Sequence, residues 1–142
     1  MRKREKMRTI IVILISVFSL SVYASNEDTL NMNIADAGDD IASAIREGNA
    51  SKLANWFAST IELSVPGKKG SYSKTQAEMI MRDFFESYPP DSFTITAEGK
   101  SAAYSLYAIG SYVSGSNTFK TYYLIRKADT GFMLHILKFE EK

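Results

Sequence analysis

Apolar residues recur at helical spacing over residues 33–47, and charged residues occupy the opposite face of the same stretch. This pattern predicts an amphipathic helix. Gly48 follows it and suits a helix C-terminus, because glycine adopts the left-handed conformation found there. A second short helix is expected to run from a cap at Asn49 or Ser51 through Phe57.

The next stretch passes from a strand pattern to a helix pattern. Alternating apolar and polar residues at 61–65 predict a half-buried strand. Residues 68–73 are expected to return beside it as a short edge strand, whose lysines and glycine discourage further pairing. Ser73 and Gln76 match a capping box, so a third helix should begin there and end before the two prolines at 89–90.

The period of the apolar residues changes to two after this third helix. Four strands are expected, at about 92–98, 102–113, 118–128 and 131–140. The links between them are short and contain glycine, which permits only antiparallel neighbours. We therefore predict an α+β fold: a curved antiparallel sheet, made of a four-strand meander plus a short N-terminal hairpin, packed against three helices as a cone.

The N-terminus has the three parts of a secretory signal peptide. Five basic residues lie within the first eight positions, a short apolar run follows, and small residues precede a polar stretch. We expect residues 1–24 to be removed by cleavage between Ala24 and Ser25, with an uncleaved signal anchor as the alternative. Residues 25–32 would then form a flexible N-terminal segment ahead of one domain at 33–142.

Export changes the charge balance of the 142-residue chain, which is +1 as a whole. Removing residues 1–24 leaves twelve basic and fifteen acidic residues, a net charge of about −3. Without a basic patch we expect no nucleic-acid partner. The chain has no cysteine, which excludes disulfides and lipidation. We therefore expect a soluble periplasmic or extracellular protein that meets a membrane only through its transient signal peptide.

Candidate chemistry is sparse, because His135 is the single histidine of the chain. It could act as a general base if a carboxylate lies within hydrogen-bond reach, but a strand histidine with a purely structural role is the simpler interpretation. Asp36, Asp39 and Asp40 cluster in the first helix, where negative charge is favoured by the helix dipole in any case. We expect no metal site, no cofactor and no catalytic residue that the sequence identifies.

The order of predicted elements resembles the nuclear transport factor two-like superfamily, which has the cystatin-like cone fold. The resemblance covers nearly all of residues 33–140 and is closest to small exported domains of Gram-negative bacteria. The segments that carry it are 44–49, 53–57, 122–127 and 132–136. It implies a pocket between the helices and the concave sheet, and often a homodimer formed through the other sheet face. It does not imply one function, because this fold hosts isomerases, dehydratases, transport factors and binding modules.

The resemblance and the aromatic pattern together suggest which side chains would line such a pocket. They are Trp56, Phe57, Phe84, Phe85, Tyr123 and His135. Tyrosines occur on both faces of the predicted strands. The face away from the helices would therefore also be covered, as a dimer surface or a ligand platform. We expect a binding or protein-interaction module, with a small apolar ligand or an envelope protein as partner. The alternative is a cofactor-free lyase or isomerase that uses His135 or a pocket tyrosine.

Overall fold

The computed structural model describes residues 26–101 and 104–142, with side chains placed from Ile34 onward. The predicted signal peptide and its cleavage site at Ala24 and Ser25 lie outside the described residues. Residues 31–142 form one compact unit, and the fold is described for that unit. None of the described helices combines the length and the apolar character needed to cross a membrane.

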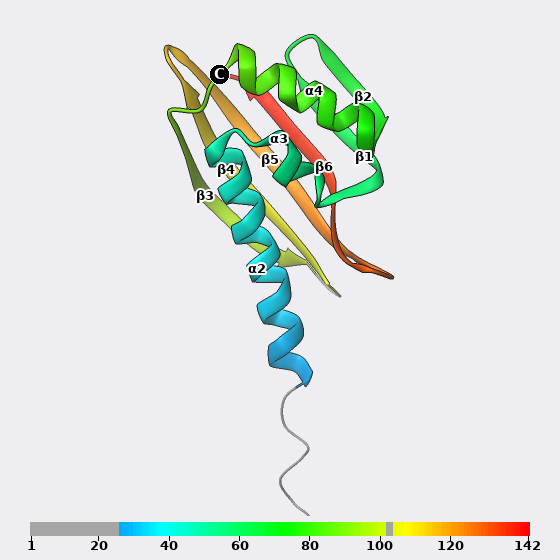
Figure 1. The fold of residues 1–142 in the computed structure, drawn as a ribbon. Coiled ribbons are helices and arrows are strands. Elements are labelled where there is room, and N and C mark those ends of the chain that lie inside the picture. Colours follow the sequence, from blue (N-terminus) through cyan, green and yellow to red (C-terminus); the bar gives the residue numbers. More distant parts are fainter. Residues whose placement is uncertain (1–25, 102–103) are drawn as a thin grey trace, which may run out of the picture. The chain divides into compact units, whose positions relative to one another are not determined.

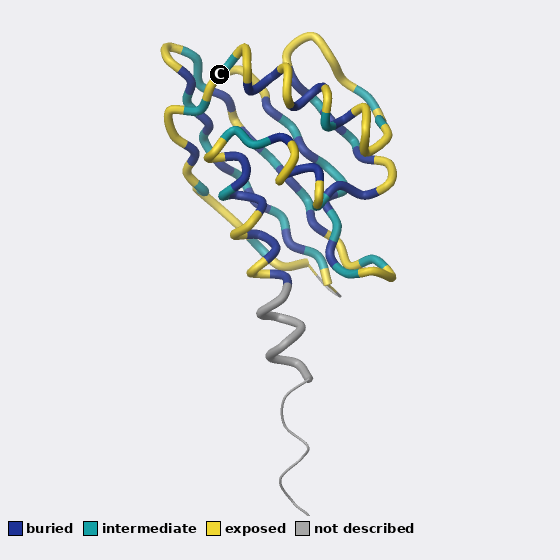
Figure 2. Tube along the Cα trace, viewed as in Figure 1, coloured by how far each residue is buried: buried dark blue, intermediate teal, exposed yellow. Residues whose placement is uncertain are grey.

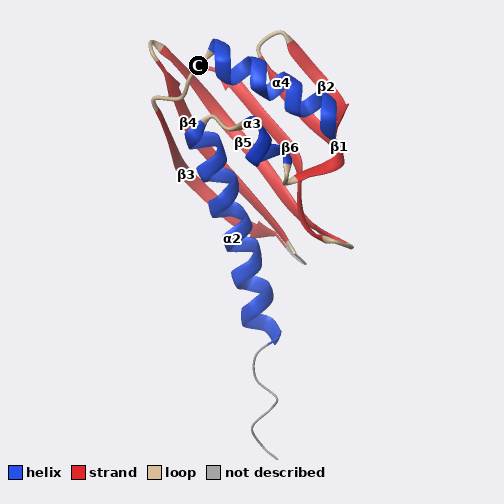
Figure 3. Cartoon of the chain, viewed as in Figure 1, coloured by secondary structure: helices blue, strands red, loops and turns tan. Residues whose placement is uncertain are grey.

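Three helices and six strands make up the described chain (Figure 1). In order they are α2 (Asn26–Glu47), α3 (Ala50–Ala54), β1 (Phe57–Val65), β2 (Lys68–Ser73), α4 (Lys74–Ser87), β3 (Ser92–Ser101), β4 (Ser105–Ser114), β5 (Asn117–Ala128) and β6 (Gly131–Glu141). The helices lie on one face of the sheet (Figure 3). This arrangement is the α+β class that the change of period predicted.

The six strands form a single sheet in the order β2-β1-β6-β5-β4-β3. The β1-β2 pair and the successive pairs from β3 to β6 are antiparallel, as their short links require. The prediction of a wholly antiparallel sheet is wrong at one place, because β1 and β6 run parallel. Strand β1 pairs with β2 along one edge and β6 pairs with β5 along one edge, so each strand has a second edge free to form hydrogen bonds. Their pairing joins the hairpin to the meander, and no local sequence pattern indicates it.

Helix α2 ends where the sequence predicted, through a Schellman motif. The Gly48 amide donates to the Ile45 carbonyl over 3.1 Å, and the Asn49 amide donates to the Ala44 carbonyl over 3.0 Å. Gly48 has a φ of +63°, which explains the glycine at this position. Helix α2 begins at Asn26, ahead of the start that the sequence predicted at residue 33.

Helix α3 is shorter than predicted and ends at Ala54. Asn49, rather than Ser51, is its N-cap, and the Asn49 side chain accepts from the Lys52 amide over 2.9 Å. Phe57 is the first residue of β1, where it pairs with Leu134 of β6. The parallel pairing with β6 therefore begins where we expected the last helical turn.

The core lies between the helices and the inner face of the sheet, where buried positions alternate along the strands (Figure 2). Helix α4 begins with the predicted capping box, in which Ser73 and Gln76 each satisfy a backbone amide of the other. Its buried residues are Ala77, Ile80, Met81, Phe84 and Phe85. Helix α4 packs against β1 and β2, and its Phe84 ring contacts rings on β4, β5 and β6.

Candidate functional site

Aromatic side chains fill the space in which the sequence predicted a pocket. The ring of Phe84 lies between 4.6 and 5.8 Å, centroid to centroid, from five other rings: Phe85, Tyr88, Tyr112, Phe119 and Phe139. Tilted and edge-on contacts at these distances are favourable packing arrangements for rings. The interior of this part of the fold is a packed core.

Three of the predicted pocket residues belong to that core. Phe57, Phe84 and Phe85 are 2%, 4% and 6% exposed. Phe84 lines a surface hollow of about 200 Å³, and Phe85 lines another of about 340 Å³. Their role in the structure is to hold α4 on the sheet, so the apolar pattern that marked them as pocket residues reports packing instead.

Tyr123 is buried beneath α2, and its hydroxyl donates to the Gly38 carbonyl over 3.4 Å. Burial raises the pKa of Tyr123 to about 12, and the negative charges of Glu98 and Asp39 add to this effect. The phenol therefore stays protonated at physiological pH. Within the described residues, the acceptor of this hydroxyl is the Gly38 carbonyl and no carboxylate is hydrogen-bonded to it.

His135 lies on the outer face of the sheet, away from the helices. Leu124 of β5 pairs with Ile136 and Ile125 pairs with Leu134, which leaves His135 as the extra residue of a β-bulge. Because of the bulge, Leu134 and Leu137 are both buried on the inner face. Strict alternation along the strand would place Leu137 on the same face as His135, and the bulge is the reason why it does not. His135 therefore lines no pocket inside the fold.

The described helices all lie on one face of the sheet, so none covers the outer face (Figure 1). The outer face carries a row of apolar side chains. Register places Tyr107, Leu124 and Ile136 side by side across β4, β5 and β6, with Ile109 and Tyr122 as the next pair. All five are half-buried, and together we call them the outer patch. Charged residues surround the outer patch, including Arg126, Lys120 with its cross-strand neighbour Glu140, and the Lys138 and Glu62 ion pair at 2.8 Å.

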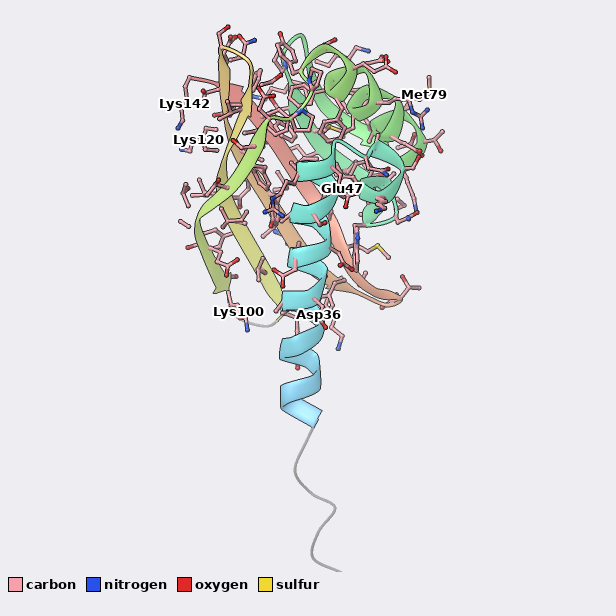
Figure 4. All side chains as sticks on the ribbon, turned by 60° about the vertical axis from the view of Figure 1, so that its left-hand side comes forward. Asp36, Glu47, Met79, Lys100, Lys120 and Lys142 are labelled. Carbon is pink, nitrogen blue, oxygen red and sulfur yellow. The ribbon has the colours of Figure 1, made fainter. Side chains whose placement is uncertain are left out.

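Trp56, the sixth predicted pocket residue, lines a surface groove instead of an internal pocket. The groove has a volume of about 520 Å³ and lies between α2, the turn from α3 to β1, and the turn from β5 to β6. Its polar residues from the helical side are Asp40, Ser43, Glu47, Lys52 and Asn55. Figure 4 marks Glu47 near the C-terminal end of α2. No motif in the sequence marks the charged groove residues. They stand out only because the fold brings them beside Trp56.

The three aspartates of α2 form no metal centre. Among residues 34–101 and 104–142, no group of three or more histidine, aspartate or glutamate side chains is placed to hold an ion. Asp36, Asp39 and Asp40 are exposed on the polar face of the helix.

Several solved structures have a similar fold. A protein of the DUF4783 family from Bacteroides uniformis is 23% identical, with 73% of this chain and 95% of that chain covered and a TM-score of 0.69. A proposed dehydratase of the nuclear transport factor two-like family from Streptomyces avermitilis is 12% identical, with coverage of 81% and 97% and a TM-score of 0.61. These likenesses show that the fold is the one the sequence resemblance implied.

A third similar structure is described as an association domain. It is a proposed calcium/calmodulin-dependent protein kinase II association domain from Xanthomonas campestris, 15% identical, with coverage of 77% and 85% and a TM-score of 0.57. A comparison with curated proteins finds no match. The model of the domain of unknown function DUF4783 matches residues 38–140, and the chain belongs to that family.

Proposed function

We propose that this protein is a non-catalytic interaction module that associates through its outer patch, with a second copy of the chain as the first partner. The observation that carries the proposal is the row of Tyr107, Leu124 and Ile136, which lies across three strands without a helix over it. Tyr and aliphatic side chains at the centre, with charges around them, are the usual composition of a protein interface.

Two further observations support association rather than ligand capture inside the fold. The space between α4 and the sheet is filled by the rings around Phe84, so an apolar ligand has no cavity there. The structurally similar protein from Xanthomonas campestris is described as an association domain. The superfamily resemblance also implies a homodimer through this face, and an envelope protein is the second class of partner that could use it.

A cofactor-free lyase or isomerase activity is the competing proposal, and the site geometry gives it less support. His135 lies on the outer face, and burial keeps the pKa of Tyr123 at about 12. Catalysis at neutral pH is more efficient with a group that titrates near that pH. The likeness to the proposed dehydratase is a likeness of fold, and fold alone does not carry an activity.

We also propose that the protein is exported and is soluble outside the cytoplasm after cleavage behind Ala24. The proposal is supported by residues 1–24, where basic residues are followed by an apolar run and then by small residues. Intact-mass measurement of the protein isolated from its cells tests this directly. A chain beginning at Ser25 is expected, and a chain that retains the leader in the membrane fraction would contradict the proposal.

Sedimentation equilibrium of the purified protein tests the association. We expect a dimer, and we expect Leu124→Lys to raise its dissociation constant at least about tenfold, because a charge would be buried at the centre of the interface. Met79→Lys, at an exposed position of helix α4 on the other side of the sheet, is the matched control and should leave the constant unchanged. A wild-type protein that remains monomeric at about 0.5 mM would overturn self-association through this face.

A further inference from the structure

The groove beside Trp56 has the size and surroundings of a small-molecule site. Its volume of about 520 Å³ falls within the range of about 300 to 1,000 Å³ that ligand pockets occupy. Helix α2, the turn at Trp56 and the turn before β6 contribute its walls, so three separate segments meet there. The groove lies on the helical side of the sheet, and none of its residues belongs to the outer patch.

The apolar part of the groove is held in place by backbone hydrogen bonds. The Trp56 amide donates to the Leu53 carbonyl over 3.1 Å, and the Trp56 carbonyl accepts from the Leu134 amide over 2.7 Å. Trp56 is half-buried and lines the groove together with Phe132 and Met133. Of the aromatic side chains, tryptophan attracts a cation most strongly through the face of its ring. A fixed backbone at this position lowers the ordering cost of binding.

The charged part of the groove has an excess of negative charge. Lys52 and Glu47 form an ion pair at 2.9 Å, and Ser43 donates to Glu47 over 3.3 Å. Hydrogen bonding and attraction from Lys52 lower the pKa of Glu47, so this carboxylate is ionised at neutral pH. Asp40 has no ion-pair partner among the residues with placed side chains. The one lysine is engaged, and one carboxylate is left to attract a cation.

We propose that this groove binds an organic cation, namely an alkylammonium group whose carbon chain lies against Trp56 and Met133 and whose charge lies near Asp40. An aromatic face and a carboxylate in one groove favour such a ligand over a neutral one. An anionic ligand would have to displace Glu47 from Lys52 and would lie close to Asp40. The same group occurs in a free amine and in a lysine side chain, and the test separates these two sources.

Titration of the purified protein with three ligands of equal chain length tests the charge preference. Trp56 is the single tryptophan, so its fluorescence reports on the groove alone, and calorimetry provides a second measurement. We expect hexylammonium to bind at least about fivefold more tightly than hexanol, and hexanoate to bind more weakly than either. Parallel titrations compare a free amine with a lysine side chain in a peptide. The two ligands are hexylammonium and Nα-acetyl-lysine-N-methylamide, whose side-chain ammonium group is unmodified.

Three variants, each of which removes one exposed charge, test which residues contribute to hexylammonium binding. Asp40→Asn should weaken hexylammonium binding by about three- to tenfold, and Lys52→Gln should strengthen it by a similar factor, because each changes one charge beside the ligand. Asp36→Asn makes the same change as Asp40→Asn on the same helix, at a residue that does not line the groove, and should have no effect (Figure 4).

The proposal fails under any of three results. The first is no binding of hexylammonium by fluorescence or calorimetry up to about 10 mM. The second is hexanoate binding that equals or exceeds hexylammonium binding and is lost in Lys52→Gln, which would show an anion site. The third is an equal effect of Asp36→Asn and Asp40→Asn on hexylammonium affinity. That result would show a general electrostatic attraction to the negative charge of the helix and no specific contact with Asp40. None of these results bears on association through the outer patch.

Discussion

The hydroxyl of Tyr112, on β4, donates a hydrogen bond to the backbone carbonyl of Tyr88 over 2.5 Å. Tyr88 is the C-cap of α4, and its own amide donates to the Phe84 carbonyl over 2.8 Å. The bond therefore fastens the end of α4 to the inner face of the sheet. Burial raises the pKa of Tyr112 far above its ordinary value, and the charge of Asp91 adds to the shift.

Removing that hydroxyl should loosen the end of α4. We expect Tyr112→Phe to lower the free energy of unfolding by about 1–2 kcal/mol, because the partly buried Tyr88 carbonyl loses its partner. Urea denaturation measures the change. Tyr72→Phe on the edge strand β2 is the control, with an expected change within about 0.5 kcal/mol. Equal effects of the two variants would show that the hydrogen bond contributes nothing.

A close approach between strands explains the glycine at position 110. A Cβ atom there would lie 2.6 Å from the Phe93 ring and 2.9 Å from the Thr94 carbonyl oxygen. We expect Gly110→Ala to destabilise the fold by about 1–3 kcal/mol, because both β3 and the ring must shift. Thermal unfolding measures this effect. Gly70→Ala is the control, since a Cβ there meets only the Tyr72 side chain at ordinary contact distance.

A double variant at Gly110 and Phe93 tests whether the Phe93 ring causes the destabilisation. If the Phe93 ring is the obstacle, the double variant Gly110→Ala with Phe93→Leu should be less destabilised than the sum of the two single variants. Additive losses would mean that the backbone contact with Thr94 carries the cost.

The Thr121 hydroxyl is buried without a hydrogen-bond partner among the described residues. Thr121 is 0% exposed and faces the core from β5. Thr121→Val replaces the hydroxyl with a methyl group of similar size, so we expect a gain of about 1 kcal/mol in the free energy of unfolding. Thr60→Val at an exposed strand position controls for the strand preference of valine. A loss of stability in Thr121→Val would indicate that the hydroxyl has a partner after all.

His135 should make stability depend on pH. Partial burial lowers the pKa of His135 below its ordinary 6.5, and the positive charge of Arg126 lowers it further. The unfolded chain therefore binds a proton more readily than the folded chain does. The contribution of His135 is fully present above pH 6.5 and is lost as the pH falls through the folded pKa.

Comparison with His135→Gln isolates this contribution from other titrating groups. We expect the free energy of unfolding of the wild type to fall more steeply between pH 8 and pH 5 than that of the variant. Urea denaturation at several pH values measures both slopes, and a nuclear magnetic resonance titration of the ring gives the pKa directly. Parallel curves for the two proteins, or a measured pKa above 6.5, would contradict the assignment.

Local patterns in the sequence determined most of the secondary structure. The end of α2 at Gly48, the capping box of Ser73 and Gln76, and the antiparallel order from β3 to β6 depend on residues close together in the chain. Such features are predictable because their hydrogen bonds join neighbours. The family resemblance followed from the same order of elements.

Tertiary contacts decided the details that define the candidate sites. Pairing with Leu134 drew Phe57 out of the predicted helix and into β1. The bulge in β6 turned His135 to the outer face, and the rings around Phe84 filled the expected pocket. Only the folded chain brings Asp40, Trp56 and Met133 to one groove. Periodicity shows which face of an element is apolar, but it does not show what packs against that face, because strand pairing and packing join residues far apart in sequence.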